Sequence, residues 1–94
     1  MKTKTAPYNP FDYLETQEEI NDYLTDAFID DDPRVFLAAL GYLAKKKGIS
    51  DIARQTGLNR ESLYKSFSGK GNPRFSTVIK VSKALGIKLN AKMM

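Results

Sequence analysis

This chain of 94 residues contains no cysteine, no histidine and no tryptophan. Without cysteine, it forms neither a disulfide nor a thiolate metal site. Without histidine, it lacks the commonest general base and the commonest transition-metal ligand. It has no apolar run of the roughly 20 residues that cross a bilayer, and no apolar stretch behind Lys2 and Lys4 that would make a signal peptide. We therefore expect a cytoplasmic protein that uses no cofactor or metal and does not contact membranes.

An enzyme is the class of protein that these absences disfavour most. The run Asp30, Asp31 and Asp32 offers carboxylate oxygens of the kind that bind divalent cations. No histidine or further acidic cluster completes such a site. The three aspartates together with the following Pro33 end a helix, and this role is enough to explain the run. The sequence thus favours a binding protein over an enzyme.

Charge is distributed very unevenly along the chain. The formal net charge is only +4. The chain has the length of one domain with one modest core, so both signs of charge belong to the same small unit. Residues 1–32 hold two lysines and nine acids, a charge of −7, whereas residues 33–94 hold thirteen basic residues and two acids, a charge of +11. The basic part has the sign that suits a polyanion, and the acidic part suits a basic protein. The alternative is that the acids only solvate one face of a helix.

The spacing of apolar residues predicts an all-α protein of five helices with short connections. Thr16, followed by Glu19 three residues later, has the spacing of a capping box that starts a helix over residues 17–29. Asp32 is placed to cap a second helix that has Pro33 at its first position. Three lysines followed by glycine mark the end of that helix.

Three shorter helices follow, each with a polar residue at its expected start. The expected capping residues are Ser50, Asn59 and Ser76. Residues 1–10 are polar and contain two prolines, which predicts an arm. Residues 11–14 alternate in polarity and are expected to form a short strand or a docked extended piece, and residues 87–89 leave room for a short C-terminal strand.

Residues 50–67 carry the most informative motif, which is two short helices joined by a turn of about three residues. This is the helix-turn-helix arrangement. Gly57 stands where the backbone needs a positive φ, and Ala53 stands where the helices cross, so that a larger side chain would separate them. The structural residues of the motif are Ala53, Gly57, Leu58, Asn59 and Leu63. The alternative interpretation is an ordinary helical hairpin within a bundle.

Polar residues after this turn fit a helix that contacts bases in the major groove. Arginine binds guanine, glutamate accepts from cytosine, and serine or lysine reaches bases or phosphates, while the loop that follows can hold phosphates. The predicted DNA-contacting residues are Arg60, Glu61, Ser62, Tyr64, Lys65, Lys70, Asn72 and Arg74.

More ordinary roles remain open for several of these residues. Glu61 is also placed for an intrahelical role beside Lys65, four residues on. Tyr64 suits a core contact that leaves its hydroxyl exposed, and the loop suits plain solvation. The three consecutive lysines at positions 45–47 are expected to end a helix and aid solubility, with weak attraction to phosphate at best.

The pattern of these residues resembles a known family. The stretches that carry the resemblance are Tyr13-Leu14, Glu18-Glu19-Ile20, Phe36-Leu37-Ala38-Ala39-Leu40-Gly41, the run from Ile52 to Lys65, and Gly71-Asn72-Pro73-Arg74-Phe75. From about residue 11 to residue 92 the chain is similar to the "probable addiction module antidote protein" family, for which Leu-Tyr-Lys followed by Gly-Asn-Pro is specific.

The resemblance implies a lambda-repressor-like fold with an Xre-type helix-turn-helix. It also implies a bacterial antitoxin that is encoded beside a small basic toxin of the RelE/ParE-like fold and silences it. Such antitoxins repress their own operon by binding operator DNA, commonly as homodimers. The alternative function is a stand-alone or phage-type repressor with no toxin partner. For self-association, residues 81–89 and residues 11–14 are the two candidate surfaces.

Together these observations predict that two parts of one compact unit have different binding functions. Residues 33–94 are expected to form the DNA-binding domain, and the acidic arm and helix of residues 1–32 to contact the toxin. Apolar side chains, including Phe11 and Leu14, would supply contact area there and acids would steer the encounter. The expected toxin-contacting residues are Tyr13, Glu15, Glu18, Glu19, Asp22, Tyr23 and Asp26.

Overall fold

The computed structural model describes residues 8–93, so most of the arm predicted for residues 1–10 lies outside the described part. The elements are η1 (Pro10–Tyr13), α1 (Gln17–Ile29), α2 (Pro33–Lys47), α3 (Ile49–Thr56), α4 (Arg60–Ser66) and α5 (Phe75–Ala84). The predicted all-α class with five helices is confirmed. Within residues 8–93, no helix is long and apolar enough to span a membrane.

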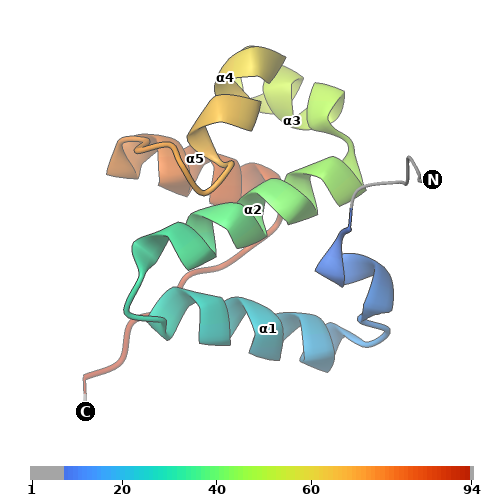
Figure 1. The fold of residues 1–94 in the computed structure, drawn as a ribbon, viewed down its shortest axis with the longest axis vertical. Helices are drawn as coiled ribbons and strands as arrows, with labels where there is room; N and C mark the ends of the chain where they lie inside the picture. The colour runs from blue at the N-terminus through green and yellow to red at the C-terminus, as the bar shows by residue number, and fades with distance from the viewer. Residues whose placement is uncertain (1–7, 94) are drawn as a thin grey trace, which may run out of the picture.

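Helix α2 is the centre of the molecule and contacts η1, α1, α3, α4 and α5. Figure 1 shows α1 along one side of α2, with α3 and α4 on the opposite side. Leu40, Leu63 and Val81, from α2, α4 and α5, are almost completely buried, and Phe11 and Ala27 from the acidic part belong to the same apolar cluster. One core therefore holds the acidic and basic parts together.

The predicted capping box at the start of α1 is present. The Thr16 Oγ1 accepts a hydrogen bond from the Glu19 backbone N–H at 3.1 Å, and Glu19 Oε1 accepts from the N–H groups of Thr16 at 3.0 Å and Glu15 at 2.7 Å. These backbone donors stabilise the ionised carboxylate and hold the pKa of Glu19 below its ordinary 4.5. The Glu19 side chain is thus occupied in starting the helix.

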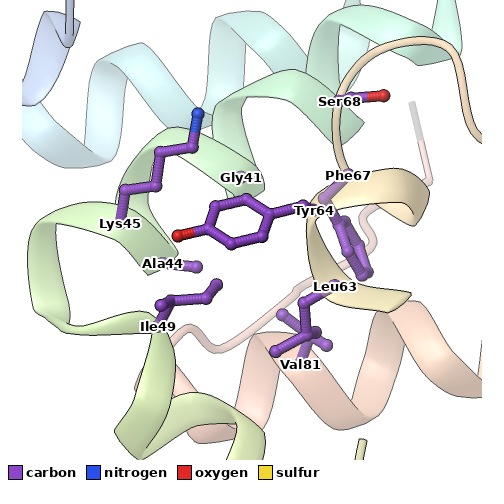
Figure 2. A pocket seen from close by; sticks show the side chains of 9 residues that line it. All are labelled: Gly41, Ala44, Lys45, Ile49, Leu63, Tyr64, Phe67, Ser68 and Val81. Atoms are coloured by element: carbon purple, nitrogen blue, oxygen red, sulfur yellow. The ribbon is translucent and has the colours of Figure 1, made fainter. Parts of the chain in front are cut away.

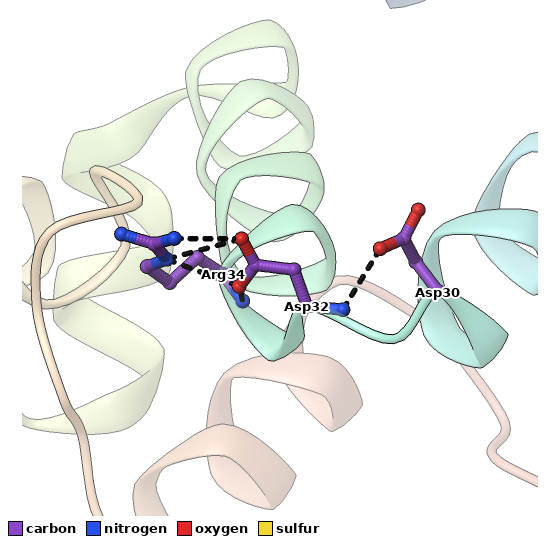
Figure 3. A network of polar contacts seen from close by, with 3 residues as sticks. All are labelled: Asp30, Asp32 and Arg34. Carbon is purple, nitrogen blue, oxygen red and sulfur yellow. Dashed lines mark hydrogen bonds and ion pairs between the residues drawn. The ribbon is translucent and has the colours of Figure 1, made fainter.

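The acidic run between α1 and α2 acts as a turn and a cap (Figure 3). Asp30 Oδ1 accepts from the Asp32 N–H at 2.8 Å, and Asp32 Oδ1 accepts from the Arg34 N–H at 2.9 Å. The guanidinium of Arg34 lies 2.8 Å from Asp32 Oδ2 and lowers the pKa of that carboxyl. Since these carboxylates bond the chain itself, helix breaking and capping account for the run, as the sequence indicated. The described residues contain no group of acids that could hold a metal ion.

Two of the predicted helix caps are wrong. Helix α3 begins at Ile49, directly after Gly48, and α5 begins at Phe75, directly after Arg74; neither start has a side-chain cap. Gly48 has a φ of 112°, and its carbonyl accepts from N–H groups of the first turn of α3. Because glycine turns the chain sharply without a Cβ clash, the helix starts before Ser50 and needs no hydroxyl.

Neither expected strand forms. Residues 11–14 lie instead at a 3-10 turn that Asn9 caps, its side chain accepting from the Phe11 N–H at 3.0 Å. Phe11 is only 4% exposed, and its ring meets that of Tyr23 edge-on at 5.2 Å. Residues 87–89 are irregular and pack two half-buried side chains on the core. The described residues offer no neighbouring strand, and a strand needs a partner for its backbone groups.

Candidate nucleic-acid interface

Residues 57–59 make a tight turn that joins α3 to α4. Gly57 lies in the left-handed region with a φ of 76°, and its N–H donates to the Ala53 carbonyl at 2.9 Å. Thr56, which is not among the residues predicted to form the site, is buried beside it. The Thr56 hydroxyl donates to the Ile52 carbonyl at 2.8 Å and accepts from the Leu58 N–H at 3.3 Å. A buried hydroxyl thereby links α3 to the middle of the turn, and the threonine directly before the turn glycine is the signal for it.

Asn59 fixes the start of α4. Its Oδ1 accepts from the Ser62 N–H at 2.7 Å, and its backbone is extended, so that α4 begins at Arg60. Arg60, Glu61 and Ser62 are all exposed in the first turn. Within the described residues Glu61 makes no ion pair with Lys65, which is also exposed. The first turn therefore presents a cation, an anion and a hydroxyl to a ligand.

The Tyr64 side chain packs against neighbouring helices and is only partly exposed. Its side chain is 42% exposed, and it lines a cavity of about 40 Å³ together with Leu63 and Val81. Figure 2 shows the ring lying across this space, with Lys45 of α2 beside it. The Lys45 Nζ is 5.7 Å from the ring centroid. Tyr64 therefore contacts α2 and keeps one edge open to solvent.

The loop after α4 is folded back against the end of that helix. A Cβ on Gly71 would lie 2.4 Å from the Lys65 carbonyl oxygen and 2.6 Å from that of Ser66, which only glycine permits. Ser68 Oγ donates to the Lys65 carbonyl at 3.1 Å and accepts from the Lys70 N–H at 3.3 Å. This holds the loop next to α4. Its predicted phosphate-contacting residues are all exposed: Lys70, Asn72 and Arg74.

Comparison with known proteins identifies the family. The family model described as "Probable addiction module antidote protein" matches residues 4–93. The chain belongs to this family. The chain is 39% identical over 92 residues to an uncharacterized protein of Haemophilus influenzae, in an alignment that covers 98% of the chain and 95% of the relative. No solved structure matches it. Membership supports an antitoxin role in a toxin–antitoxin module and implies a toxin as partner.

The acidic surface of the antidote lies on α1, across the molecule from α3 and α4 (Figure 1). Glu18, Asp22 and Asp26 follow each other at intervals of four residues, so they share one face of the helix. All three are exposed and make no ion pair within the described residues. We call these three residues the acidic stripe. Glu15, one turn before it, is exposed as well.

The remaining residues predicted to contact the toxin have different surroundings. Tyr13 is 71% exposed. Tyr23 is half-buried against Phe11, and this burial raises the pKa of its hydroxyl. The carboxylate of Glu19 belongs to the capping box. The expectation that Phe11 offers apolar contact area to a partner is wrong, because its side chain fills the antidote's own core.

Proposed function

We propose that this antidote binds operator DNA through α4, represses its own operon, and neutralises a small basic toxin of the RelE/ParE-like kind through its acidic N-terminal part. The observation that carries the proposal is the position of the two charged surfaces. The exposed first turn of α4 belongs to the basic residues 33–94, and the acidic stripe lies on the other side of α2 within residues 1–32. One molecule can then hold DNA at one side and a basic protein at the other without the two competing.

The proposed DNA contacts start from the capped end of α4. Arg60 is placed to bind the O6 and N7 atoms of guanine, and Glu61 to accept from cytosine N4. Ser62 and Lys65 reach neighbouring bases or phosphates from the same exposed turns. The loop behind α4 adds backbone contacts, which position the protein without specifying sequence.

Replacing Arg60 by alanine is expected to weaken binding to the sequence upstream of the antidote's own gene by about 1–3 kcal/mol. The loss should be smaller on a shuffled duplex, because a base contact discriminates between sequences. Fluorescence anisotropy with both labelled duplexes measures this. Lys88→Ala is the matched control, since Lys88 is also an exposed cation but follows α5. Equal affinity of the unaltered protein for both duplexes at physiological salt would contradict operator binding.

The toxin site is proposed on α1 and on the turn before it. The acidic stripe has no intramolecular cation to compensate it within the described residues, and Tyr13, in the turn η1 that precedes α1, offers exposed aromatic area. Aromatic anchors surrounded by charges of one sign suit a partner of the opposite sign. Co-purification with the product of a short basic reading frame beside this gene tests the pairing.

We further propose that the antidote binds its operator as a homodimer. One helix-turn-helix covers only a few base pairs, which gives little selectivity in a genome, and two copies place half-sites about one helical turn apart. Within the two candidate surfaces, Val81, Leu85 and Phe11 lie in the core of the monomer, whereas Tyr13 is exposed. Exposed apolar side chains elsewhere in the described residues include Phe28, Ile29 and Phe75.

Sedimentation of the antidote with an excess of the upstream duplex is expected to show two protein chains on each duplex. The reason is that an inverted repeat presents two equivalent half-sites to a two-fold symmetric dimer. A duplex cut to one half-site is the control and should bind more weakly. A complex of one chain with one full-length duplex would contradict the dimer.

A further inference from the structure

The three lysines at the end of α2 have different surroundings. Lys45 Nζ lies 6.0 Å from the ring centroid of Tyr42 and 5.7 Å from that of Tyr64, so two aromatic rings hold this ammonium group in place. Lys46 Nζ lies 2.6 Å from Asp12 Oδ1 of η1. Lys47 is exposed. The three lysines look alike in the sequence, but Lys45 is held by two aromatic rings and Lys46 is paired with a carboxylate.

Lys45 and Lys46 line a shared hollow at the junction of η1 and α2. The hollow is open to solvent, has a volume of about 320 Å³, and is completed by Tyr8, Asn9 and Asp12. The Asn9 amide donates to the Tyr42 carbonyl at 2.9 Å, which fixes the turn against the end of α2. The hollow is large enough for a phosphate group, and two ammonium groups border it.

The position of this hollow relative to α4 suggests its ligand. Figure 2 shows Lys45 on one side of Tyr64 and Ser68, at the start of the loop, on the other. A helix in the major groove, which is about 12 Å wide, has a phosphate backbone on each side. The loop contains the exposed cations Lys70 and Arg74, and Lys45 is an exposed cation on the other side of Tyr64.

We propose that the hollow between η1 and the end of α2 binds a backbone phosphate of the DNA duplex held by α4. Lys45 makes the contact, and Asp12 limits the affinity of the site because it neutralises Lys46 and repels the phosphate. This inference rests on the proposed DNA binding and adds a second, sequence-independent contact to it. It also gives the three lysines different roles, whereas the sequence alone assigns all three to helix ending and solubility, with weak attraction to phosphate at best.

Salt-dependent anisotropy with two labelled probes tests the site: the duplex upstream of the gene and a shuffled duplex of the same length. Each phosphate contact contributes about −0.9 to the slope of log affinity against log salt. Lys45→Met is expected to make the slope shallower by about 0.9, and to lower affinity roughly three- to tenfold in dilute salt, on both probes. Lys45→Arg should keep the slope. Asp12→Asn should make the slope steeper and raise affinity, since it frees Lys46.

Lys47→Met is the matched control, because it removes the same charge one residue past the hollow and should leave the slope within error. Circular dichroism checks that each variant folds. If Lys45→Met weakens binding without changing the slope, Lys45 acts only through the packing of Tyr64 and the phosphate site is wrong. An Asp12→Asn variant that binds DNA no better than the unaltered chain contradicts the competing role of Asp12. Failure of the unaltered antidote to bind either probe would instead contradict the proposed DNA binding itself.

Discussion

Replacing Gly41 by alanine is expected to lower the free energy of unfolding by about 2–3 kcal/mol, a large fraction of the stability of so small a domain. An added Cβ would lie 2.2 Å from the carbonyl oxygen of Phe67 and 3.2 Å from its carbonyl carbon. These are backbone atoms, and the Phe67 N–H is bonded to the Leu63 carbonyl at 3.0 Å. Neither the backbone at Gly41 nor that at Phe67 can move easily, so α2 and the end of α4 would have to separate. Thermal and urea unfolding followed by circular dichroism measure the loss.

Gly57→Ala is the matched control for this prediction. Gly57 has a positive φ, but nothing lies within 4 Å of an added Cβ. Its replacement should therefore cost only the backbone strain of about 1–2 kcal/mol. If both variants lose the same stability, close approach of α2 to α4 is not the reason for glycine at position 41.

Reversing the acidic stripe with Glu18→Lys, Asp22→Lys and Asp26→Lys is expected to slow association with the toxin at least tenfold and to abolish rescue of toxin-arrested cells. Charges at the edge of an interface act mainly on the rate of encounter, so the association rate should also lose its usual decline with added salt. DNA binding should persist or strengthen, because the reversed charges no longer repel phosphate. Stopped-flow mixing with purified toxin and co-expression in cells measure the two effects.

The control for this triple variant is its neutral counterpart, with Glu18→Gln, Asp22→Asn and Asp26→Asn, which should give an intermediate rate. Glu19 is left unchanged because its carboxylate holds the start of α1. Deleting residues 1–29 would be a poorer test, since it also removes Phe11 and Ala27 from the core. Unchanged association of a folded triple-lysine variant would place the toxin site elsewhere on the helical core.

Features that depend on neighbouring residues were predictable from the sequence. The bounds of α1, the capping box at Thr16 and the cap at Asp32 followed from residue types at fixed spacings. The starts of α3 and α5 did not, because serine is a cap only where the backbone turns at that residue. At Gly48 and Arg74 the backbone turned two residues earlier than the hydroxyls at positions 50 and 76.

Some features of the candidate site were also predictable from the sequence, and others were not. The sequence indicated which residues follow Asn59 in the first turn of a capped helix, and the structure places them there, exposed. It did not indicate that Thr56 links the turn or that Tyr64 lies against Lys45. Lys45 and Tyr64 are nineteen positions apart, so their contact depends on how α2 and α4 pack.

By itself, the sequence determined the helical class, the local start of α1, α2 and α4, the opposed charges of the two parts, and the family. These follow from short-range hydrogen bonding, from periodicity and from composition, which need no knowledge of packing. Only the tertiary structure decided that Phe11 is core, that Gly41 closely approaches the backbone of Phe67 at the end of α4, and that Asp12 pairs with Lys46 while Lys45 does not. The physical reason is that each of these depends on close approach between distant segments, which is set by how the whole core fills space.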